Sequence, residues 1–522
     1  MSKLRTAALV ILFLMLIIAV IINFTNRTAD TREEIIISIP HSQYIRNIDN
    51  NYYKKWLEEQ TGLSITFNIV YENYSVDYLR TMFASGYIHS DAFFSFLSED
   101  DLSGYHGVLQ EFGEKGYIIP LNAFAERSIY LNAIFNDYSE YDLRSLMTSP
   151  DGNIYYMPAF DPSVPERHFQ VMWLNQRWLK DLGLGIPQTT DELREVLSAF
   201  NTRDMSIPLA GCYNISSLQS YHFIINAFVL SDPANSYLFM ENGAVRFAPV
   251  TDEWREAMKY LHELYKDGLL SPFQFSFDDY ELATIANDPR KILGGFTSRS
   301  ITDVIFHSNP EIINEFIHVA PIAGPAGARN ATVTTPIPRP AAVITSSCQN
   351  PEAVFRLLDL MLSEEAFLIG RYGEENVDWV RADVTDIDFY SNKASVRVIN
   401  HLQNRVQNKH ISETGAFFAY PFYADSVTFS AFDTSYEYKN ARAYRVYEQY
   451  QPDEYIKATI FYGKPEIQSL RRVIGAYTEE SIEAFITGAA NPFDDAAWEA
   501  HLRKYQELGI EGFINLVAEV LR

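Results

Sequence analysis

The strongest constraint on the fold is an alternation of short apolar runs with helical segments near the start of the chain. Residues 34–40 (EIIISIP), 64–71 (SITFNIVY) and 91–97 (DAFFSFL) predict strands, and residues 52–60 and 74–84 predict the helices between them. Strands joined through single helices need right-handed crossovers, which place them side by side in a parallel sheet. Because ligands of such sheets bind beyond the carboxyl ends of the strands, the pattern predicts an α/β lobe with a binding edge.

A second unit of the same kind follows the motif DGNIYYMP at residues 151–158. Residues 169–175 (FQVMWLN) predict a strand, and a later helix opens with Thr189 and Glu192 at the spacing of a capping box. Residues 321–340 contain five prolines and two glycines, which exclude a regular helix or a central strand. With 522 residues, the chain is long enough for two large α/β domains that meet at such a boundary.

Residues 1–30 predict an N-terminal signal peptide or signal anchor. Lys3 and Arg5 precede an unbroken apolar run at 7–22, and no clear cleavage site of the small-x-small type follows. We therefore expect an uncleaved helix that tethers the protein, with release after cleavage as the alternative. The basic end comes first, so the positive-inside rule exports everything after the helix to the cell surface or periplasm.

Charge and cysteine content narrow the function classes. The chain has 67 acidic and 42 basic residues, a formal net charge of −25, which phosphate backbones and anionic lipids repel. We therefore expect no nucleic-acid partner. Cys212 and Cys348 are the only cysteines, and outside the cytoplasm they could form one disulfide or stay as buried thiols.

Catalytic motifs are missing. The sequence contains no GxxxxGK[ST], GxGxxG or GxSxG pattern. His262 begins an HExxH-like segment, but Lys266 stands where the second zinc ligand would be. Acidic clusters at 99–101, 278–279 and 364–365 are expected to be solvated surface, since chance clusters are common among so many carboxylates. We expect no enzyme activity, no cofactor and no metal.

Aromatic residues are abundant instead. The chain has 33 Tyr, 35 Phe and 6 Trp, many of them at strand ends or in loops such as GAFFAYPFY at 415–423. Aromatic faces at the rim of a cleft suit amphipathic ligands such as sugars or peptides. Packing in a core is the alternative for each of them.

Four blocks, in the right order, resemble the family 1 extracellular solute-binding proteins, the sugar-receptor branch of ABC importers that includes maltose-binding proteins. DGNIYYMP at 151–158 resembles the start of the family's first crossover. WLNQRWLKDLGLGIPQTTDELREVLSAF at 173–200 resembles its pattern of strand, Asn, helix, Leu-Gly, Pro-x-Thr and helix. Residues 351–379 and 485–520 resemble later blocks of its longer members.

The resemblance implies an α/β, two-lobed periplasmic-binding-protein fold of type II. Each lobe would be a mainly parallel sheet flanked by helices, and the ligand would be trapped in the cleft between lobes by hinge closure. On this sequence the first lobe would be 33–159 plus 336–379, and the second 160–335 plus 380–522. The resemblance implies two partners, an oligosaccharide as the small-molecule ligand and the transmembrane subunits of an ABC permease, and it implies that the chain itself is a monomer.

The sequence departs from the family's pattern at two points, and the family features found there are not expected in this protein. No cysteine precedes Cys212, so the lipobox cysteine of Gram-positive members is absent. Longer members often carry a calcium-like loop after the Thr-x-x-Glu helix, and the equivalent here is NTRDM at 201–205. A single Asp beside an Arg cannot supply six or more oxygens, so we expect no calcium there.

Positions at strand ends and crossovers predict the ligand-binding residues. They are His41, Tyr44, Phe94, Ser95, Tyr156, Trp173, Phe296, Arg299 and Trp379. We expect Tyr156 and Trp173 to stack on sugar rings and Arg299 to donate paired hydrogen bonds to hydroxyls or a carboxylate.

Three functions fit these observations. The leading one is a binding protein that delivers an oligosaccharide to a membrane importer. The second is a tethered sugar sensor that presents its ligand to a membrane kinase, and the third an extracellular carbohydrate-active enzyme. The sequence does not choose among sugars, and it leaves peptides and acidic sugars open, because loop geometry sets specificity.

Overall fold

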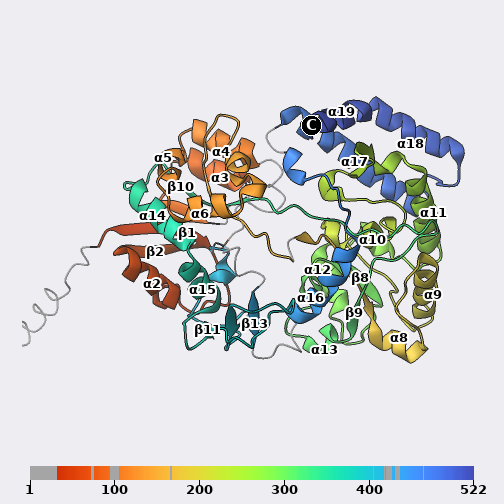
Figure 1. Cartoon of the computed structure of the whole chain (residues 1–522), viewed down its shortest axis with the longest axis horizontal. Coiled ribbons are helices and arrows are strands. Elements are labelled where there is room, and N and C mark those ends of the chain that lie inside the picture. Colours follow the sequence, from red (N-terminus) through yellow and green to blue (C-terminus); the bar gives the residue numbers. More distant parts are fainter. Residues whose placement is uncertain are drawn as a thin grey trace, which may run out of the picture.

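The structure is a computed structural model in which the chain forms two lobes side by side (Figure 1). It describes residues 32–71, 76–86, 88–94, 105–164, 167–403, 405–416, 418, 426–429, 436–461 and 464–521. The predicted N-terminal helix, Ser95 and most of the GAFFAYPFY segment lie outside the described residues. Within the described residues, no helix is long and apolar enough to cross a membrane.

The first lobe is built around a five-stranded sheet of order β2-β1-β3-β10-β4. Strand β1 (Glu34–Pro40) pairs in parallel with β2 (Ser64–Val70) and β3 (Ala92–Phe94), which confirms the predicted crossovers. Strand β10 (Arg339–Ile344) runs antiparallel to both β3 and β4 (Met157–Ala159). It does so because its chain enters this sheet from the second lobe, whereas the chain of β4 leaves toward it.

Helices cover both faces of this sheet (Figure 1). They are α2 (Tyr52–Thr61), α3 (Val76–Ala84), α4 (Tyr105–Glu114), α5 (Asn122–Ala125), α6 (Tyr130–Asp137), α7 (Leu143–Met147), α14 (Pro351–Met361) and α15 (Glu364–Tyr372), with 3-10 turns at Ile48–Asn50 and Ser139–Tyr141. The apolar residues between sheet and helices form the first core, which includes Ile37, Phe93 and Leu358.

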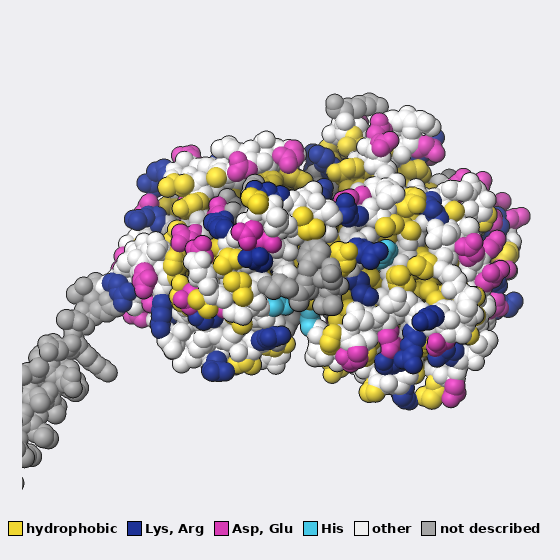
Figure 2. All heavy atoms as spheres, turned by 60° about the horizontal axis from the view of Figure 1, so that its bottom comes forward, with side chains coloured by type: hydrophobic (Ala, Val, Ile, Leu, Met, Phe, Trp, Pro, Cys, Tyr) yellow, Lys and Arg dark blue, Asp and Glu magenta, His cyan; other side chains and the backbone are white. Residues whose placement is uncertain are grey.

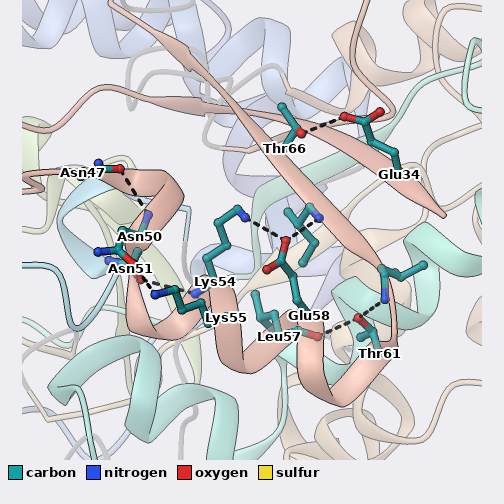
Figure 3. Close-up of polar contacts among 12 residues, drawn as sticks. Glu34, Asn47, Asn50, Asn51, Lys54, Lys55, Leu57, Glu58, Thr61 and Thr66 are labelled. Carbon is teal, nitrogen blue, oxygen red and sulfur yellow. Dashed lines mark hydrogen bonds and ion pairs between the residues drawn. The ribbon is translucent and has the colours of Figure 1, made fainter. Parts of the chain in front are cut away.

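Figure 3 shows how local chemistry ties α2 to the sheet. The side chain of Asn51 caps the helix by accepting hydrogen bonds from the backbone of Tyr53 and Lys54. Glu58 then accepts from Lys54 Nζ at 2.8 Å and from the backbone N–H of Ile65 on β2 at 2.9 Å. The helix ends at Gly62, whose φ of 70° is the left-handed conformation that glycine adopts without strain. These contacts fix the helix against β2.

The second lobe has a sheet of order β8-β5-β9, and here the expectation of a mainly parallel sheet is wrong. Strand β5 (Val171–Asn175) runs antiparallel to both β8 (Gly295–Ser298) and β9 (Phe316–Val319). The reason is that β5 enters from the first lobe and so begins at the edge where its neighbours end. The strands β6 (Leu238–Glu241) and β7 (Ala244–Phe247) form a separate hairpin.

Helices surround the second sheet and extend to the carboxyl end of the described chain. They are α8 (Gln176–Leu182), α9 (Thr190–Phe200), α10 (Ser220–Ile225), α11 (Asp252–Lys266), α12 (Asp279–Ala286), α13 (Pro310–Ile313), α16 (Tyr436–Tyr447), α17 (Pro465–Thr487), α18 (Asp495–Glu507) and α19 (Ile510–Val520). The 3-10 turns are Ser216–Leu218, Pro233–Asn235, Ala248–Val250, Pro272–Phe275, Ile301–Asp303, Glu448–Tyr450 and Ala458–Phe461, whereas the turn Ser412–Thr414 lies beside Ile411 of the first core. Thr189 caps α9 as predicted, accepting from the N–H of Glu192 at 3.2 Å. The second core runs from the sheet to α19.

A third, small sheet joins β11 (Trp379–Arg381), β12 (Val396–Val398) and β13 (Val427–Phe429). Its apolar side packs on Phe367 and Leu368 of α15. Ile411, further along the chain, belongs to the first core. Residues after 380 therefore pack against the first lobe for some distance before α16 joins the second.

The two cysteines lie in different cores, Cys212 in the second and Cys348 in the first. Both are free, buried thiols, which answers the question that the sequence left open. Burial raises the pKa of the Cys212 thiol to about 11 and that of Cys348 to about 12. Neither forms a thiolate nucleophile at neutral pH.

Candidate ligand-binding site

The space between the lobes is bordered by strand ends. In the first lobe β1 runs from the outer side toward the second lobe (Figure 1), and it ends at Pro40. Its parallel neighbour β2 ends at Val70, so the residues after both strands lie at the same edge. In the second lobe β8 ends, and the antiparallel β5 begins, at one common edge, because Ser298 pairs with Val171.

An aromatic pair stands at the edge of the first lobe. His41 follows β1, and its ring stacks on that of Tyr71, which follows β2, with ring centroids 4.5 Å apart and an interplanar angle of 26°. Both residues are exposed, Tyr71 at 77%. A backbone hydrogen bond of 2.8 Å from His41 N–H to the carbonyl of Val70 holds the two strand ends together. The pair offers a flat, open face with polar ring atoms, which suits a sugar ring.

His41 was predicted and Tyr71 was missed. The rule that selected His41, the first residue beyond a parallel strand, selects Tyr71 as well, because the run SITFNIVY ends on it. Tyr44 lies on the loop after β1 and is half-buried. Its carbonyl accepts a 2.8 Å hydrogen bond from Gln407 N–H, so this loop is held against the segment between β12 and β13.

Arg299 stands at the edge of the second lobe, directly after β8, and is half-buried as its position predicted. Its carbonyl accepts a hydrogen bond from the hydroxyl of Tyr444 on α16 at 3.0 Å. The backbone of Arg299 is thereby held at the interlobe edge by a helix from the other end of the chain.

A loop with an exposed tyrosine lies beside Arg299. Gln170, just before β5, donates 2.9 Å hydrogen bonds to the carbonyls of Ser217 and Gln219 and to Thr297 on β8. These bonds place the loop before α10 at the sheet edge, and from this loop Tyr213 extends, 56% exposed.

Tyr280 at the start of α12 is 72% exposed and belongs to the same region. Asn214 donates to the carboxylate of Asp279 at 2.8 Å, which links the Tyr213 loop to α12. Helix α12 lies on the side of the second lobe that faces the first (Figure 1). No motif marked Tyr213 or Tyr280 in the sequence, because only tertiary contacts bring them to this edge.

Five of the predicted ligand contacts are buried instead. They are Phe94, Tyr156, Trp173, Phe296 and Trp379, each at most 2% exposed. Trp173 lies inside the second core with its ring edge-on to His318 at 6.3 Å. Trp379 donates from Nε1 to the carbonyl of Gly373 at 2.9 Å. Neither face of the Tyr156 or Trp173 ring is open, so in this conformation neither ring can stack on a sugar as predicted. The physical reason is that each of these rings lies in or next to a strand and packs into one of the three cores, where other segments cover it.

The segments that connect the lobes are held by backbone and ring contacts. The carbonyl of Arg167 accepts from Thr334 N–H at 3.0 Å, so two crossing segments run together. His168 stacks on Tyr444 with centroids 4.8 Å apart and bonds through Nδ1 to the carbonyl of Val164 at 2.8 Å. Burial lowers the pKa of His168 to about 4, so the ring is neutral at pH 7 and Nδ1 donates that bond.

A separate hollow of about 450 Å³ lies between the lobes on the β4 side of the first sheet. Tyr141, Ser145 and Thr148 line it from the first lobe, and Thr459 and Lys464 line it from the second. Its lining includes none of the predicted ligand contacts. The strand ends define a different candidate binding site, formed by His41 and Tyr71 at the edge of the first lobe and by Tyr213 and Arg299 at the edge of the second.

Among the residues that the structure describes, no group of three or more His, Cys, Asp or Glu side chains could hold a metal ion. In the 201–205 loop, the guanidinium of Arg203 lies 4.7 Å from the ring centroid of Trp178. It is also 3.9 Å from a carboxylate oxygen of Asp181. The guanidinium of Arg203 therefore places a positive charge at this loop.

The chain matches the model of the bacterial extracellular solute-binding proteins over residues 42–366, which is more than half of its length. The protein belongs to this family. The fructooligosaccharide ABC transporter substrate-binding protein FusA of Streptococcus pneumoniae is 23% identical over 486 residues, 88% of this chain and 84% of FusA.

Solved structures share the fold. FusA with an EF-hand mutation, in complex with fructo-nystose, gives a TM-score of 0.70 at 20% identity, covering 93% of this chain and 98% of that one. An extracellular solute-binding protein from Bifidobacterium longum subsp. infantis gives 0.69 at 18% identity, covering 94% and 98%. These similarities confirm the two-lobed α/β fold. No relative among them is described as an enzyme.

Proposed function

We propose that this protein captures an oligosaccharide between its lobes and delivers it to the permease of an ABC importer. The observation that carries this proposal is the exposed His41–Tyr71 ring pair at the carboxyl ends of adjacent parallel strands. Family membership supports a binding role, and the similarity to FusA, a fructooligosaccharide-binding protein, supports a saccharide ligand. Binding needs hinge closure and no reaction, so the proposed protein is a receptor without catalytic activity.

We also propose which residues form each lobe and where in the cell the protein lies. We assign 33–159 and 336–379 to the first lobe, together with the stretch from 380 to 418, because Val396 and Ile411 pack on that side. Residues 160–335 and the chain from α16 onward form the second. We further propose an extracytoplasmic monomer, tethered by residues 1–30 or released after cleavage, which agrees with the extracellular family.

A thermal-shift screen of the purified full-length chain tests the ligand class. The panel contains fructooligosaccharides, glucose-based oligosaccharides, uronic acid oligomers and short peptides. A ligand that binds only the folded state stabilises it by about 2.7 kcal/mol at a concentration roughly 100-fold above Kd, which raises the unfolding midpoint by several degrees. We expect a response to one saccharide class, with the saccharide recovered unchanged. A response confined to peptides would overturn the saccharide, and release of shortened saccharide would overturn the non-catalytic role.

A further inference from the structure

One carboxylate faces the opposite lobe. Glu437 lies on α16, a helix whose later residues Ala443, Tyr444 and Tyr447 pack in the second core. Its Oε1 is 3.7 Å from Nε2 of His401, which follows β12 in the small sheet that packs on α15. The two side chains therefore join parts of the protein that belong to different cores. Figure 2 shows histidine side chains at this boundary between the lobes.

The carboxylate is shielded from water. The Glu437 side chain is 18% exposed, and both of its oxygens are buried. Neither oxygen accepts a hydrogen bond of good geometry from the part of the chain that the structure describes. Nε2 of His401 is buried in the same way. A shielded carboxylate without such bonds is costly unless positive groups lie close to it.

Titratable side chains from both lobes lie near Glu437. His307 of the second lobe packs edge-on against Tyr436 at 4.6 Å. Burial lowers the pKa of His307, and the charge of Glu437 opposes this shift while that of His401 adds to it. Burial raises the pKa of Tyr436 and the Glu437 charge raises it further, whereas the charge of Arg371, at the end of α15, lowers it. His401 is thus the first-lobe residue whose side chain lies against the Glu437 carboxylate.

We propose that Glu437 is a closure latch, a positioning residue that holds the lobes together through its contact with His401 without touching the ligand. When the lobes separate, water replaces His401 beside the carboxylate, and when they close, the carboxylate is shielded and depends on that contact. Anything that favours the closed state raises the apparent affinity for a ligand that closure traps. This inference rests on the proposed function, because its first readout is ligand affinity.

The test compares Glu437→Gln, His401→Gln and the double variant with the wild type, in the full chain. Saccharide affinity is measured by calorimetry, and the interlobe distance by spin labels at Ile129 and Phe493, which are exposed on different lobes. We expect Glu437→Gln to weaken binding about 10-fold, as for one lost charged contact, and to widen the distance in the ligand-free protein. The double variant should bind no more weakly than Glu437→Gln, because both changes break one contact.

A matched control is Glu448→Gln, an exposed carboxylate just beyond α16, which should bind as the wild type does. The latch would be overturned if Glu437→Gln weakened binding of one saccharide but left the ligand-free interlobe distance unchanged, and if the affinity losses of Glu437→Gln and His401→Gln added in the double variant. That result would show a direct contact with the ligand. Unchanged affinity and distances in Glu437→Gln would also overturn the latch. If the wild type binds no saccharide, the proposed function fails, and the ligand-free distances alone still decide for or against the latch.

Discussion

The imidazole ring of His41 stacks on the phenol ring of Tyr71, and the pair is exposed where two adjacent parallel strands end. If this pair is the platform for a sugar ring, Tyr71→Ala should weaken saccharide binding about 10-fold or more while changing stability little, because the ring is outside the core. Calorimetric titration of the variant with the saccharide found in the screen measures the effect.

Phe493→Ala is the control for this variant, since Phe493 is also an exposed aromatic, 49%, but lies between α17 and α18. It should bind as the wild type does. Equal saccharide affinity of Tyr71→Ala and the wild type would show that the ring pair is not part of the binding site.

Substitutions of Trp173 test whether this residue belongs to the hydrophobic core or to the ligand-binding site. The ring is fully buried in the second core, so Trp173→Ala should lower the free energy of unfolding by about 3–5 kcal/mol through lost packing and a cavity. Trp173→Phe should keep most ligand affinity at temperatures well below its midpoint. Urea unfolding and titration of both variants measure this. A large loss of ligand affinity in a stable Trp173→Phe variant would show that Trp173 contacts the ligand.

Asp359 of α14 caps a distant helix. Its buried carboxylate accepts hydrogen bonds from Ser128 Oγ at 2.5 Å and from the N–H groups of Ile129 and Leu131 at 3.0 Å, at the start of α6. Asp359→Ala leaves these buried donors unpaired and should cost about 2–4 kcal/mol of stability. Urea unfolding of the variant measures the loss.

The comparison for Asp359 is Glu352→Ala on the same helix, which breaks an exposed 3.0 Å ion pair with Arg127. Exposed pairs of this kind contribute at most about 1 kcal/mol, so the change should be small. Similar losses in the two variants would show that the cap contributes no more than a surface contact.

His501 predicts a pH dependence of stability. It is buried between α18 and its neighbours, where Nε2 bonds to the carbonyl of Pro249 at 2.9 Å, and burial lowers its pKa to about 4. Between pH 6.5 and 4 the unfolded chain binds a proton at this residue and the folded chain does not, so stability falls as the pH falls. His501→Phe should reduce the slope of unfolding free energy against pH by about 1.4 kcal/mol per pH unit there. Urea unfolding between pH 4.5 and 6 measures both slopes, and parallel slopes would contradict the prediction.

The 201–205 loop should not respond to calcium. Arg203 places its guanidinium between Trp178 and Asp181, and a cation there opposes a bound Ca²⁺. Millimolar CaCl₂ and EDTA should give the same unfolding midpoint. A midpoint raised by calcium in the wild type, and unchanged by it in Asp204→Asn, would place a calcium site at this loop.

Much of the fold could be predicted because it follows from local patterns. The parallel pairing of β1 with β2 follows from two apolar runs joined by one helix, and the caps at Asn51 and Thr189 depend on residues close in sequence. The binding site was harder to predict than the fold. His41 and Arg299 could be placed at strand ends, whereas Tyr213 and Tyr280 reach the same region through contacts that no spacing shows.

By itself, the sequence determined where strands and helices form and in which order, because backbone geometry and apolar periodicity act over a few residues. Only the tertiary structure decided that Trp173 is core and Tyr71 is surface, since exposure depends on which distant segments cover each side chain. It likewise decided that β5 runs antiparallel to its neighbours and that Glu437 meets His401. Such pairings are set by packing the whole chain, because the free energy of burying one group depends on all the groups around it.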